Sequence, residues 1–339
     1  MNPGPDLSRV PGGVALHSQS GGLSVDFGFI GKWRGIHFSK VVSFGNGCDL
    51  REAEMLRYLR HDPETKIICM YMEGVADGRE FFAALKEAAA EKPVIVIKGG
   101  LSESGSRAAA SHTASLGGSR AIWEAALKQC NVVQVSNLEE MSDAALAFSL
   151  VPPREYKSCS VVGGGGALGI AAADAAESFG IAVPKLRDDL REAILDILPK
   201  PGSSAANPID VANPFVRPDQ IREILLRASE DKNINIHILI QLLYHYKSIK
   251  LSMGIQNMKD ITPYKDLAKV CREVMDIGKK PVVLVIPNIR QDEDSIEIEE
   301  INRETRRLFT EAGMPVFDDV TNALRAIASI SKYYRRRRK

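Results

Sequence analysis

The strongest constraint on the fold is a series of short apolar runs separated by longer stretches with helical periodicity. The clearest run is residues 66–71, Lys-Ile-Ile-Cys-Met-Tyr, in which apolar side chains follow one another without alternation. A strand has this composition when both faces of its sheet are covered, as in parallel sheets. Because parallel strands need crossover connections, usually helices, such runs predict alternating strands and helices. We therefore expect an α/β protein with mainly parallel sheets.

The length of the chain and a break in its pattern indicate two domains. At 339 residues the chain is longer than the ~250–300 residues that a single hydrophobic core usually supports. Residues 151–155, Val-Pro-Pro-Arg-Glu, place two prolines and then charges between periodic segments, which is typical of a linker. We therefore expect domains at residues 1–152 and 153–339. The first has the element order of a flavodoxin-like or Rossmann-like domain, and the second is also α/β with a mainly parallel sheet.

Strands and helices are expected to alternate through both domains. The strands are expected at residues 13–17, 40–44, 66–71, 93–98, 132–135, 158–162, 181–183, 234–241, 281–286 and 314–317. The helices are expected to start at residue 23 and to cover 50–61, 77–91, 119–130, 137–149, 167–179, 188–198, 217–229, 261–277, 297–312 and 319–333. Asp49 and Glu52 have the spacing of a capping box for the helix at 50–61, and Asn137 is a suitable N-cap. His237 lies inside an apolar strand, so we expect it to be packed or hydrogen-bonded in the core.

Composition and charge exclude several classes of protein. The formal net charge is +1, so no general affinity for nucleic acid or for a membrane is implied. No apolar run approaches the ~20 residues that span a bilayer, and no signal peptide is visible. The five cysteines are scattered without a CxxC pair, which argues against a zinc cluster or a disulfide framework and suits a reducing cytoplasm. We expect a cytoplasmic protein without a metal site. The basic end, residues 333–339, should be solvated and frayed, the alternative being a tail that contacts an anion or a partner.

Two turns that lead from a strand into a helix consist of small residues. They are residues 18–22, Ser-Gln-Ser-Gly-Gly, and residues 163–166, four successive glycines. A helix N-terminus presents free backbone N–H groups, and small residues let an anion approach them. Phosphate binding is therefore predicted, the alternative being ordinary tight turns, which need the same small residues. The second turn lacks the GxxxxGKS/T pattern and the acidic residue of a dinucleotide site. The residues concerned are Ser18, Ser20, Gly21, Gly22, Gly164, Gly165 and Gly166.

A long stretch of small and polar residues, 98–118, follows the strand at 93–98. A loop of this length in a compact α/β domain is usually functional or disordered. His112 is its only side chain that can act as a nucleophile near neutral pH. Glu73 lies just past the strand at 66–71, at the edge where such sheets place ligands. The alternatives are a mobile surface loop with an incidental histidine, and a solvated glutamate.

The two turns and the histidine are compatible with one chemistry. If both helix N-termini faced one point, about half a positive charge from each would meet there. Such a place suits a doubly negative group, and a phosphorylated imidazole is one that needs fixed backbone donors. Glu73 would then orient His112 through the other ring nitrogen and favour its nucleophilic tautomer.

Taken together, these motifs resemble the NDP-forming acyl-CoA synthetases, such as the ADP-forming acetate–CoA ligases, and more remotely succinyl-CoA synthetase. The resemblance covers residues 13 to about 324. In the first domain it rests on residues 18–22, on 62–66 (Asp-Pro-Glu-Thr-Lys) running into 73–74, and on 108–118 (Ala-Ala-Ala-Ser-His-Thr-Ala-Ser-Leu-Gly-Gly). In the second it rests on the glycine turn and on 207–210, Asn-Pro-Ile-Asp.

The resemblance implies two flavodoxin-like, succinyl-CoA synthetase-like domains and a multistep ligase reaction. Acyl-CoA, phosphate and ADP would interconvert with the free acid, CoA and ATP through an acyl phosphate and a phosphohistidine. The histidine corresponds to His112, and the glutamate that supports it corresponds to Glu73. No covalently bound cofactor is implied, and the substrates are CoA, phosphate and ADP or ATP with Mg²⁺ on a partner subunit. The remaining residues implied are Ser111 and Thr113 as supports of the loop, and Asn207 and Asp210 as a candidate site in the second domain.

The sequence also departs from the family pattern. The family usually has glycine after the threonine of the histidine motif, where this chain has Ala114, which stiffens the loop. The chain begins where the second domain of the family begins, so an ATP-grasp subunit and a separate CoA-binding Rossmann domain are expected as partners in a hetero-oligomer. An alternative is a non-catalytic scaffold or regulatory subunit that binds CoA, acyl-CoA or phosphate. A nucleotide-dependent oxidoreductase would need a dinucleotide fingerprint that the sequence lacks.

Overall fold

The computed structural model describes residues 7–107 and 119–337. Four residues named above, Ser111, His112, Thr113 and Ala114, lie outside the described residues. The chain divides into two compact units, Met1–Ser149 with Lys332–Lys339, and Leu150–Ser331. The end of the C-terminal helix therefore groups with the first unit, whereas the sequence-based bounds placed it in the second.

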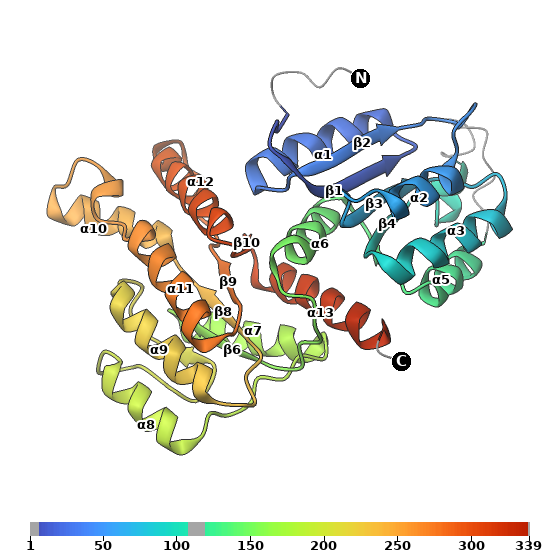
Figure 1. The fold of residues 1–339 in the computed structure, drawn as a ribbon. Coiled ribbons are helices and arrows are strands. Elements are labelled where there is room, and N and C mark those ends of the chain that lie inside the picture. The colour runs from blue at the N-terminus through green and yellow to red at the C-terminus, as the bar shows by residue number, and fades with distance from the viewer. Residues whose placement is uncertain (1–6, 108–118, 338–339) are drawn as a thin grey trace. The chain divides into compact units, whose positions relative to one another are not determined.

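The first unit is built on a five-stranded parallel sheet in the order β2-β1-β3-β4-β5. Its strands are β1 (Pro11–Ser18), β2 (Phe38–Ser43), β3 (Ile67–Met72), β4 (Val94–Lys98) and β5 (Val133–Val135). Its helices include α1 (Gly21–Arg34), α2 (Glu52–His61), α3 (Gly78–Glu91), α5 (Arg120–Gln129) and α6 (Leu138–Leu150), as Figure 1 shows. Each of these elements was predicted, with ends that differ by a few residues.

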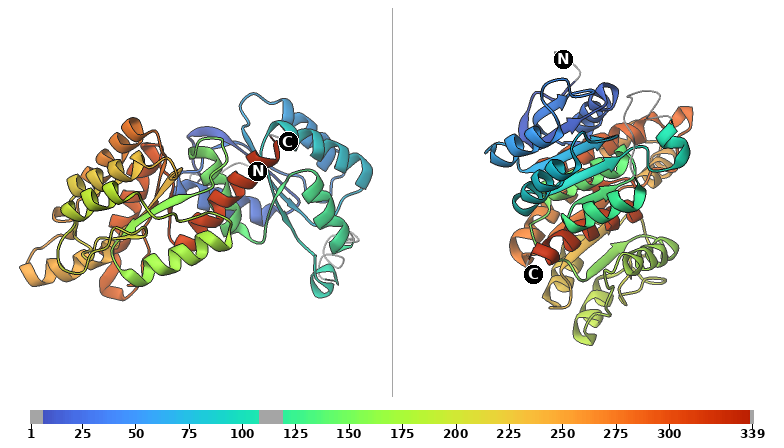
Figure 2. Two further views of the ribbon diagram at one scale, coloured as in Figure 1. Left: turned by 90° about the horizontal axis from the view of Figure 1, so that it is seen from below. Right: turned by 90° about the vertical axis from the view of Figure 1, so that its right-hand side faces the viewer.

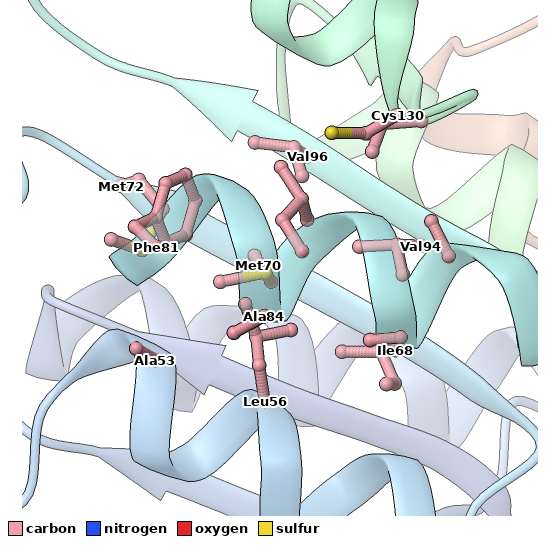
Figure 3. Packing of buried hydrophobic residues seen from close by; sticks show 14 of the residues in the cluster. Ala53, Leu56, Ile68, Met70, Met72, Phe81, Ala84, Val94, Val96 and Cys130 are labelled. Carbon is pink, nitrogen blue, oxygen red and sulfur yellow. The ribbon is translucent and has the colours of Figure 1, made fainter. Parts of the chain in front are cut away.

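The strand order determines which helices share a face of this sheet. The connection through α1 runs toward β2, whereas those through α2, α3 and α5 run toward the opposite edge. Because such crossovers are right-handed, α1 lies on one face and α2, α3 and α5 lie on the other. Leu56 of α2, Met70 of β3 and Phe81 of α3 belong to the apolar core under these three helices (Figure 3). On the face of α1, a buried ion pair joins Arg34 to Asp143 of α6.

The second unit repeats this architecture with a parallel sheet in the order β10-β9-β8-β6-β7. Its strands are β6 (Cys159–Gly163), β7 (Ile209–Asp210), β8 (Ile236–Ile240), β9 (Val282–Val285) and β10 (Val316–Phe317). Its helices include α7 (Gly166–Ser178), α8 (Asp188–Ile197), α9 (Pro218–Glu230), α10 (Tyr246–Met253), α11 (Tyr264–Gly278), α12 (Ile296–Glu311) and, as far as Ser331, α13 (Val320–Arg337). Helix α9 lies beside α8 and α11, as can be followed in Figures 1 and 2. The expected fold class, α/β with mainly parallel sheets in both units, is therefore confirmed.

The predicted capping box of α2 is wrong. Helix α2 begins at Glu52, with Arg51 as its N-cap, and the Arg51 N–H donates to the Glu54 carboxylate at 2.8 Å. The Glu52 carboxylate instead accepts from the Ala76 N–H at 2.8 Å. The acidic side chain that the sequence assigned to a local cap therefore makes a long-range contact, which joins α2 to the segment after β3.

Four further elements differ from the prediction. The strand expected at 181–183 is reduced to a single bridge between Ser158 and Ala182. Strand β7 and helix α10 were not predicted. Helix α13 continues to Arg337, because the Tyr333 hydroxyl donates to the Ala89 carbonyl at 2.9 Å and the Asn131 side chain donates to the Tyr333 carbonyl at 3.1 Å. The expectation of fraying is therefore wrong as far as Arg337.

Candidate functional site

The first-unit residues selected from the sequence gather at the carboxyl ends of β1, β3 and β4, which are neighbours in the sheet. The register pairs Ser18 with Tyr71, and Met72 with Lys98. The turn after β1, Glu73 after β3 and Gly99 after β4 therefore leave the sheet side by side. This is the edge at which open α/β sheets bind ligands.

The β1–α1 turn is shaped by two serine hydroxyls. Ser18 is buried, and its hydroxyl donates to the Ser20 carbonyl at 2.8 Å and accepts from the Ser20 N–H at 3.0 Å. Ser20 is the N-cap of α1, and its hydroxyl accepts from the Leu23 N–H at 3.3 Å. The first turn of α1 contains no acidic residue, and a Cβ built on Gly22 would meet no atom within 4 Å. Open space beside the first N–H groups of a helix is what a small anion needs.

Gln19 joins this turn to the segment that carries Glu73. Its side-chain oxygen accepts from the backbone N–H groups of Glu73 and Gly74, the second at 3.2 Å. Its side-chain nitrogen donates to the Gly74 carbonyl at 3.1 Å, and its backbone N–H donates to the Tyr71 carbonyl at 3.1 Å. One side chain therefore fixes the backbone around Glu73 relative to the N-terminus of α1.

The two oxygens of the Glu73 carboxylate differ, because one has a hydrogen-bond partner and the other has none in the described residues. Oε1 accepts from the Tyr71 hydroxyl at 3.0 Å, and burial raises the pKa of Tyr71 to about 12, so this donor keeps its proton. Oε2 is buried and has no hydrogen-bond partner within residues 7–107 and 119–337. A Cβ on Gly99 would lie 2.9 Å from the Tyr71 hydroxyl and 3.6 Å from Glu73 Cγ, so the bare glycine makes room for both side chains. An unsatisfied buried acceptor costs about 1–3 kcal/mol, so Oε2 is placed to receive a donor from a ligand or from another part of the chain.

Lys98, the last residue of β4, holds the Glu73 backbone through its carbonyl. The residue is 5% exposed, and Nζ donates to the Glu73 carbonyl at 2.7 Å and to the Gly99 carbonyl. Nζ also lies 4.9 Å from the centroid of the Trp123 ring, within cation–π range. Burial lowers the pKa of Lys98 to about 8, and the charge of Glu73 opposes that shift. The site therefore contains a buried ammonium group beside its carboxylate.

The β6–α7 turn of the second unit differs in its chemistry. Gly165 is the N-cap of α7 with a φ of 102°, which only glycine adopts without strain. A Cβ on Gly163 would lie 2.8 Å from the Ile240 side chain, so this position also requires glycine. The turn borders a cavity of about 270 Å³ that Asp210 also lines. The Asp210 carboxylate accepts from the Gly165 N–H at 3.2 Å and from the Ala212 N–H at 2.8 Å, so a negative charge already lies at the N-terminus of α7.

Asn207 is a support of this turn. Its side-chain nitrogen donates to the carbonyls of Cys159 at 3.1 Å and Pro184 at 2.8 Å, and its side-chain oxygen accepts from the Val161 N–H at 2.9 Å. The residue is 6% exposed, and all three partners are backbone groups. Asn207 therefore holds the segment that leads into β7 against β6, whereas Asp210 borders the cavity.

The sequence-based site residues thus fall into two groups. In the first unit, the β1–α1 turn with Ser18, Ser20, Gly21 and Gly22 is linked to Glu73 through Gln19. In the second unit, the turn at 163–166 is linked to Asp210 and supported by Asn207. His112, Ser111 and Thr113 lie outside the described residues, so their roles stay predictions. The described ranges contain no group of three His, Cys, Asp or Glu side chains placed to hold a metal ion.

Three site residues were missed by sequence reasoning. Gln19 lies in the middle of the predicted turn, Tyr71 precedes Glu73 by two residues, and Lys98 ends an apolar strand with a charge. A lysine at the carboxyl end of a parallel strand, and a tyrosine two residues before a strand-end carboxylate, were the available signals.

No helix in the described parts of the chain is long and apolar enough to cross a membrane.

Comparison with known proteins agrees with this arrangement. Residues 11–148 match the family model described as succinyl-CoA ligase like flavodoxin domain. The chain is 33% identical to the ADP-forming acetate–CoA ligase I of Archaeoglobus fulgidus, over 95% of this chain and 42% of that protein. It is 32% identical to the alpha subunit of the ADP-forming acetate–CoA ligase I of Pyrococcus furiosus, over 96% of this chain and 64% of that subunit.

A solved structure agrees over both units. It is the dinucleotide forming acetyl-coenzyme A synthetase 1 of Ca. Korarchaeum cryptofilum in complex with phosphate and ADP. The TM-score is 0.77 at 27% identity, and the match covers 98% of this chain and 66% of that one. The chain therefore spans less than two thirds of the length of these three relatives. Sequence and fold together show that the chain belongs to the NDP-forming acyl-CoA synthetase family, of which it contains two flavodoxin-like units.

Proposed function

We propose that the chain is the phosphohistidine-bearing part of an NDP-forming acyl-CoA synthetase. In the proposed cycle, phosphate attacks the thioester carbon of acyl-CoA, and CoA leaves as the acyl phosphate forms. A ring nitrogen of His112 then attacks the phosphorus atom, the bond between phosphorus and the acyl oxygen breaks, and the free acid leaves. The phosphoryl group finally passes from the ring nitrogen to the terminal phosphate oxygen of ADP, which gives ATP and neutral His112.

The observation that carries this proposal is that Oε2 of Glu73 has no hydrogen-bond partner in the described residues. A histidine that attacks through one ring nitrogen keeps its proton on the other and needs an acceptor there. Glu73 Oε2 is a buried acceptor without a partner in the described residues, at the sheet edge where the turn of Ser18 and Ser20 opens. The Tyr71 hydroxyl bonds the carboxylate and Gln19 bonds the Glu73 backbone N–H, so the carboxylate does not have to reorganise when the imidazole arrives.

The proposed reaction needs partners that supply the other substrates. An ATP-grasp subunit would hold ADP or ATP with Mg²⁺, and a separate Rossmann domain or subunit would bind CoA. Because CoA and ADP are cytoplasmic metabolites, we place the proposed hetero-oligomer in the cytoplasm.

The proposal is tested by labelling the chain in the presence of its ATP-grasp partner. With Mg²⁺ and ATP carrying 32P in the γ-phosphate, we expect acid-labile, base-stable label on His112. Glu73→Gln keeps the size of the side chain but removes the carboxylate, and it should slow labelling about 100-fold or more. Label that persists in His112→Ala, or a wild-type chain that takes no label with all partners present, would refute the proposal.

One observation favours a second candidate, a phosphate- or CoA-binding subunit without turnover. The Asp210 carboxylate occupies the Gly165 N–H at the N-terminus of α7, where a transferred phosphoryl group would meet a like charge. A chain of this kind would bind inorganic phosphate at the β1–α1 turn and would remain unlabelled in the experiment above. Labelling therefore separates the two functions. The synthetase part should become labelled, whereas the non-catalytic subunit should bind phosphate and take no label.

A further inference from the structure

Two lysines flank β4 and make closely similar contacts. Lys92 precedes the strand, and its Nζ donates to the backbone carbonyls of Leu59 and Asp62, both at 2.7 Å. Lys98 ends the strand, and its Nζ donates to the backbone carbonyls of Glu73, at 2.7 Å, and Gly99. Each ammonium therefore joins two backbone carbonyls. Burial lowers the pKa of both lysines.

The two lysines differ in the part of the sheet that they hold. Lys92 lies at the amino edge, where it ties down the end of α2 and the residue that follows it. Lys98 lies at the carboxyl edge, where it ties together the segments that follow β3 and β4. Ligands of open parallel sheets bind at the carboxyl edge and not at the amino edge. Similar chemistry thus serves a purely structural place in one case and the candidate site in the other.

Three contacts around Glu73 each fix a different part of the residue. Gln19 binds its backbone N–H, Lys98 binds its backbone carbonyl, and Tyr71 binds Oε1. The Gly99 backbone, which Lys98 also binds, lies against the carboxylate stem, since a Cβ there would be 3.6 Å from Glu73 Cγ. Only Oε2 is left without a partner in the described structure. Lys98 is therefore the one charged group in this set, and it links Glu73 to the start of the loop segment after β4.

We propose that Lys98 is a positioning residue that fixes the Glu73 carboxylate at the carboxyl edge of the sheet for the phosphoryl transfer proposed above. This inference rests on the proposed function of Glu73. Lys98 touches no reacting atom, and it acts through the Glu73 and Gly99 carbonyls. A displacement of about 1 Å at a catalytic group can cost up to about 100-fold in rate, so the loss of this ammonium should slow the reaction far more than it disturbs the fold.

The chain supplies its own matched control. Lys98→Met and Lys92→Met each remove one ammonium that bonds two carbonyls and keep an unbranched side chain of similar length. We expect similar, small losses in the urea midpoint for both variants. In the labelling experiment with the ATP-grasp partner, Lys92→Met should label at the wild-type rate, and Lys98→Met should label about 10- to 100-fold more slowly.

The site of phosphorylation on the ring gives a readout that stability alone does not change. Glu73 contacting one ring nitrogen should direct the phosphoryl group to the other, so 31P NMR should show one phosphohistidine isomer in the wild type and in Lys92→Met. In Lys98→Met we expect a mixture of both isomers. Equal labelling rates and the same single isomer in both lysine variants would overturn the positioning role.

A measurement that needs no phosphoryl transfer separates this inference from the proposed function. NMR titration of lysine side chains should give Lys98 a pKa near 8, and Glu73→Gln should lower it further because an attractive charge is lost. The pKa of Lys92 should not respond to that substitution. An unchanged Lys98 pKa in Glu73→Gln would refute the coupling even if labelling succeeds. A wild-type chain that takes no label would refute the proposed function and with it the use of Lys98 in catalysis.

Discussion

The β1–α1 and β6–α7 turns occupy the same place in two similar units, yet their N–H groups meet different partners. In the first unit, Ser20 caps α1 with a neutral hydroxyl. In the second, the glycine turn has no side chain of its own, and the Asp210 carboxylate from β7 fills the place of a cap. The first turn therefore offers an anion a neutral surface, whereas the second offers one that a negative charge already occupies.

This difference shows that the topology supplies an N-terminus at the sheet edge but does not determine its charge. Both turns consist of small residues, which is why the sequence predicts the same role for them. The residue that separates them, Asp210, lies 45 residues beyond Gly165 in the chain. In the second unit, the charge at the helix N-terminus is thus set by a neighbouring strand of the sheet, β7.

Each unit also contains a buried histidine, and the two histidines differ in their hydrogen bonds. His17 of β1 stacks on Phe44 at 4.2 Å, and neither of its ring nitrogens has a partner in the described structure. His237 of β8 is bonded to Ser160 at 2.7 Å and to Ser229 at 2.8 Å, which confirms the prediction that it is a hydrogen-bonded core group. Burial lowers the pKa of each histidine to about 3.

These lowered pKa values predict acid destabilisation. In the unfolded chain a histidine binds a proton below about pH 6.5, whereas the folded protein leaves both rings neutral until about pH 3. Stability is therefore fully present above pH 6.5 and falls as the pH drops toward 3, by about 1.4 kcal/mol per pH unit for each histidine. At pH 5, each should cost about 2 kcal/mol relative to pH 7 in urea unfolding.

Substitution of each histidine by leucine sharpens the comparison. His17→Leu removes two polar atoms without partners, so it should be neutral or stabilising at pH 7 and should remove its share of the acid loss. His237→Leu leaves the Ser160 and Ser229 hydroxyls without their ring partner, so it should cost about 1–3 kcal/mol at pH 7. If the two variants behaved alike at pH 7, the difference in hydrogen bonding between the two rings would have no energetic meaning.

Most of the fold follows from local signals in the sequence, and most of the site does not. Uninterrupted apolar runs identified the strands of both sheets except β7, and Asn137 caps α6 as predicted, since its side-chain oxygen accepts from the Glu140 N–H at 2.8 Å. These signals span a few residues. Short elements with weak periodicity, such as α10 and the bridge at Ala182, were missed or overestimated because tertiary contacts decide them.

The contacts of Glu73 could not be read from the sequence because they cross the sheet. Gln19 lies 54 residues before Glu73, and Lys98 lies 25 residues after it. Both reach it only because β1, β3 and β4 are neighbours in the sheet, and alternation of strands and helices leaves that order open. Glu52 shows the same limit, since its spacing fits a local cap but its carboxylate bonds Ala76 across the unit.

Asp210→Asn tests whether one charge separates the two turns. Asparagine keeps an oxygen that can accept from the Gly165 and Ala212 N–H groups, and only the negative charge is lost. We expect inorganic phosphate to bind the second turn about tenfold more tightly at low salt, as followed by the amide shifts of Gly165 and Gly166. In the wild type, the amides of Gly21 and Gly22 should respond at lower phosphate concentrations than those of the second turn.

Asp219→Asn is the matched control for this change. Asp219 lies in the first turn of α9 and bonds Arg217, so the substitution alters the net charge of the same unit by the same amount. Phosphate binding at the glycine turn should not change in this variant. Equal effects of the two substitutions would assign the gain to net charge, and unchanged binding in Asp210→Asn would mean that the Asp210 carboxylate does not compete with anions.

The smallest expected effect separates an anion site from an ordinary turn. A Cβ on Gly22 meets no atom within 4 Å, so Gly22→Ala should stabilise α1 by about 0.5–1 kcal/mol. Gly78→Ala at the start of α3 also meets open space, and there the N–H groups are already bonded by the Asp77 carboxylate. Both variants should raise the urea midpoint, but only Gly22→Ala should weaken phosphate binding at the β1–α1 turn and slow labelling of His112, each a few-fold. If Gly22→Ala gained stability and bound phosphate as the wild type does, the small residues of this turn would serve chain geometry alone, and the first unit would lose its distinction from the second.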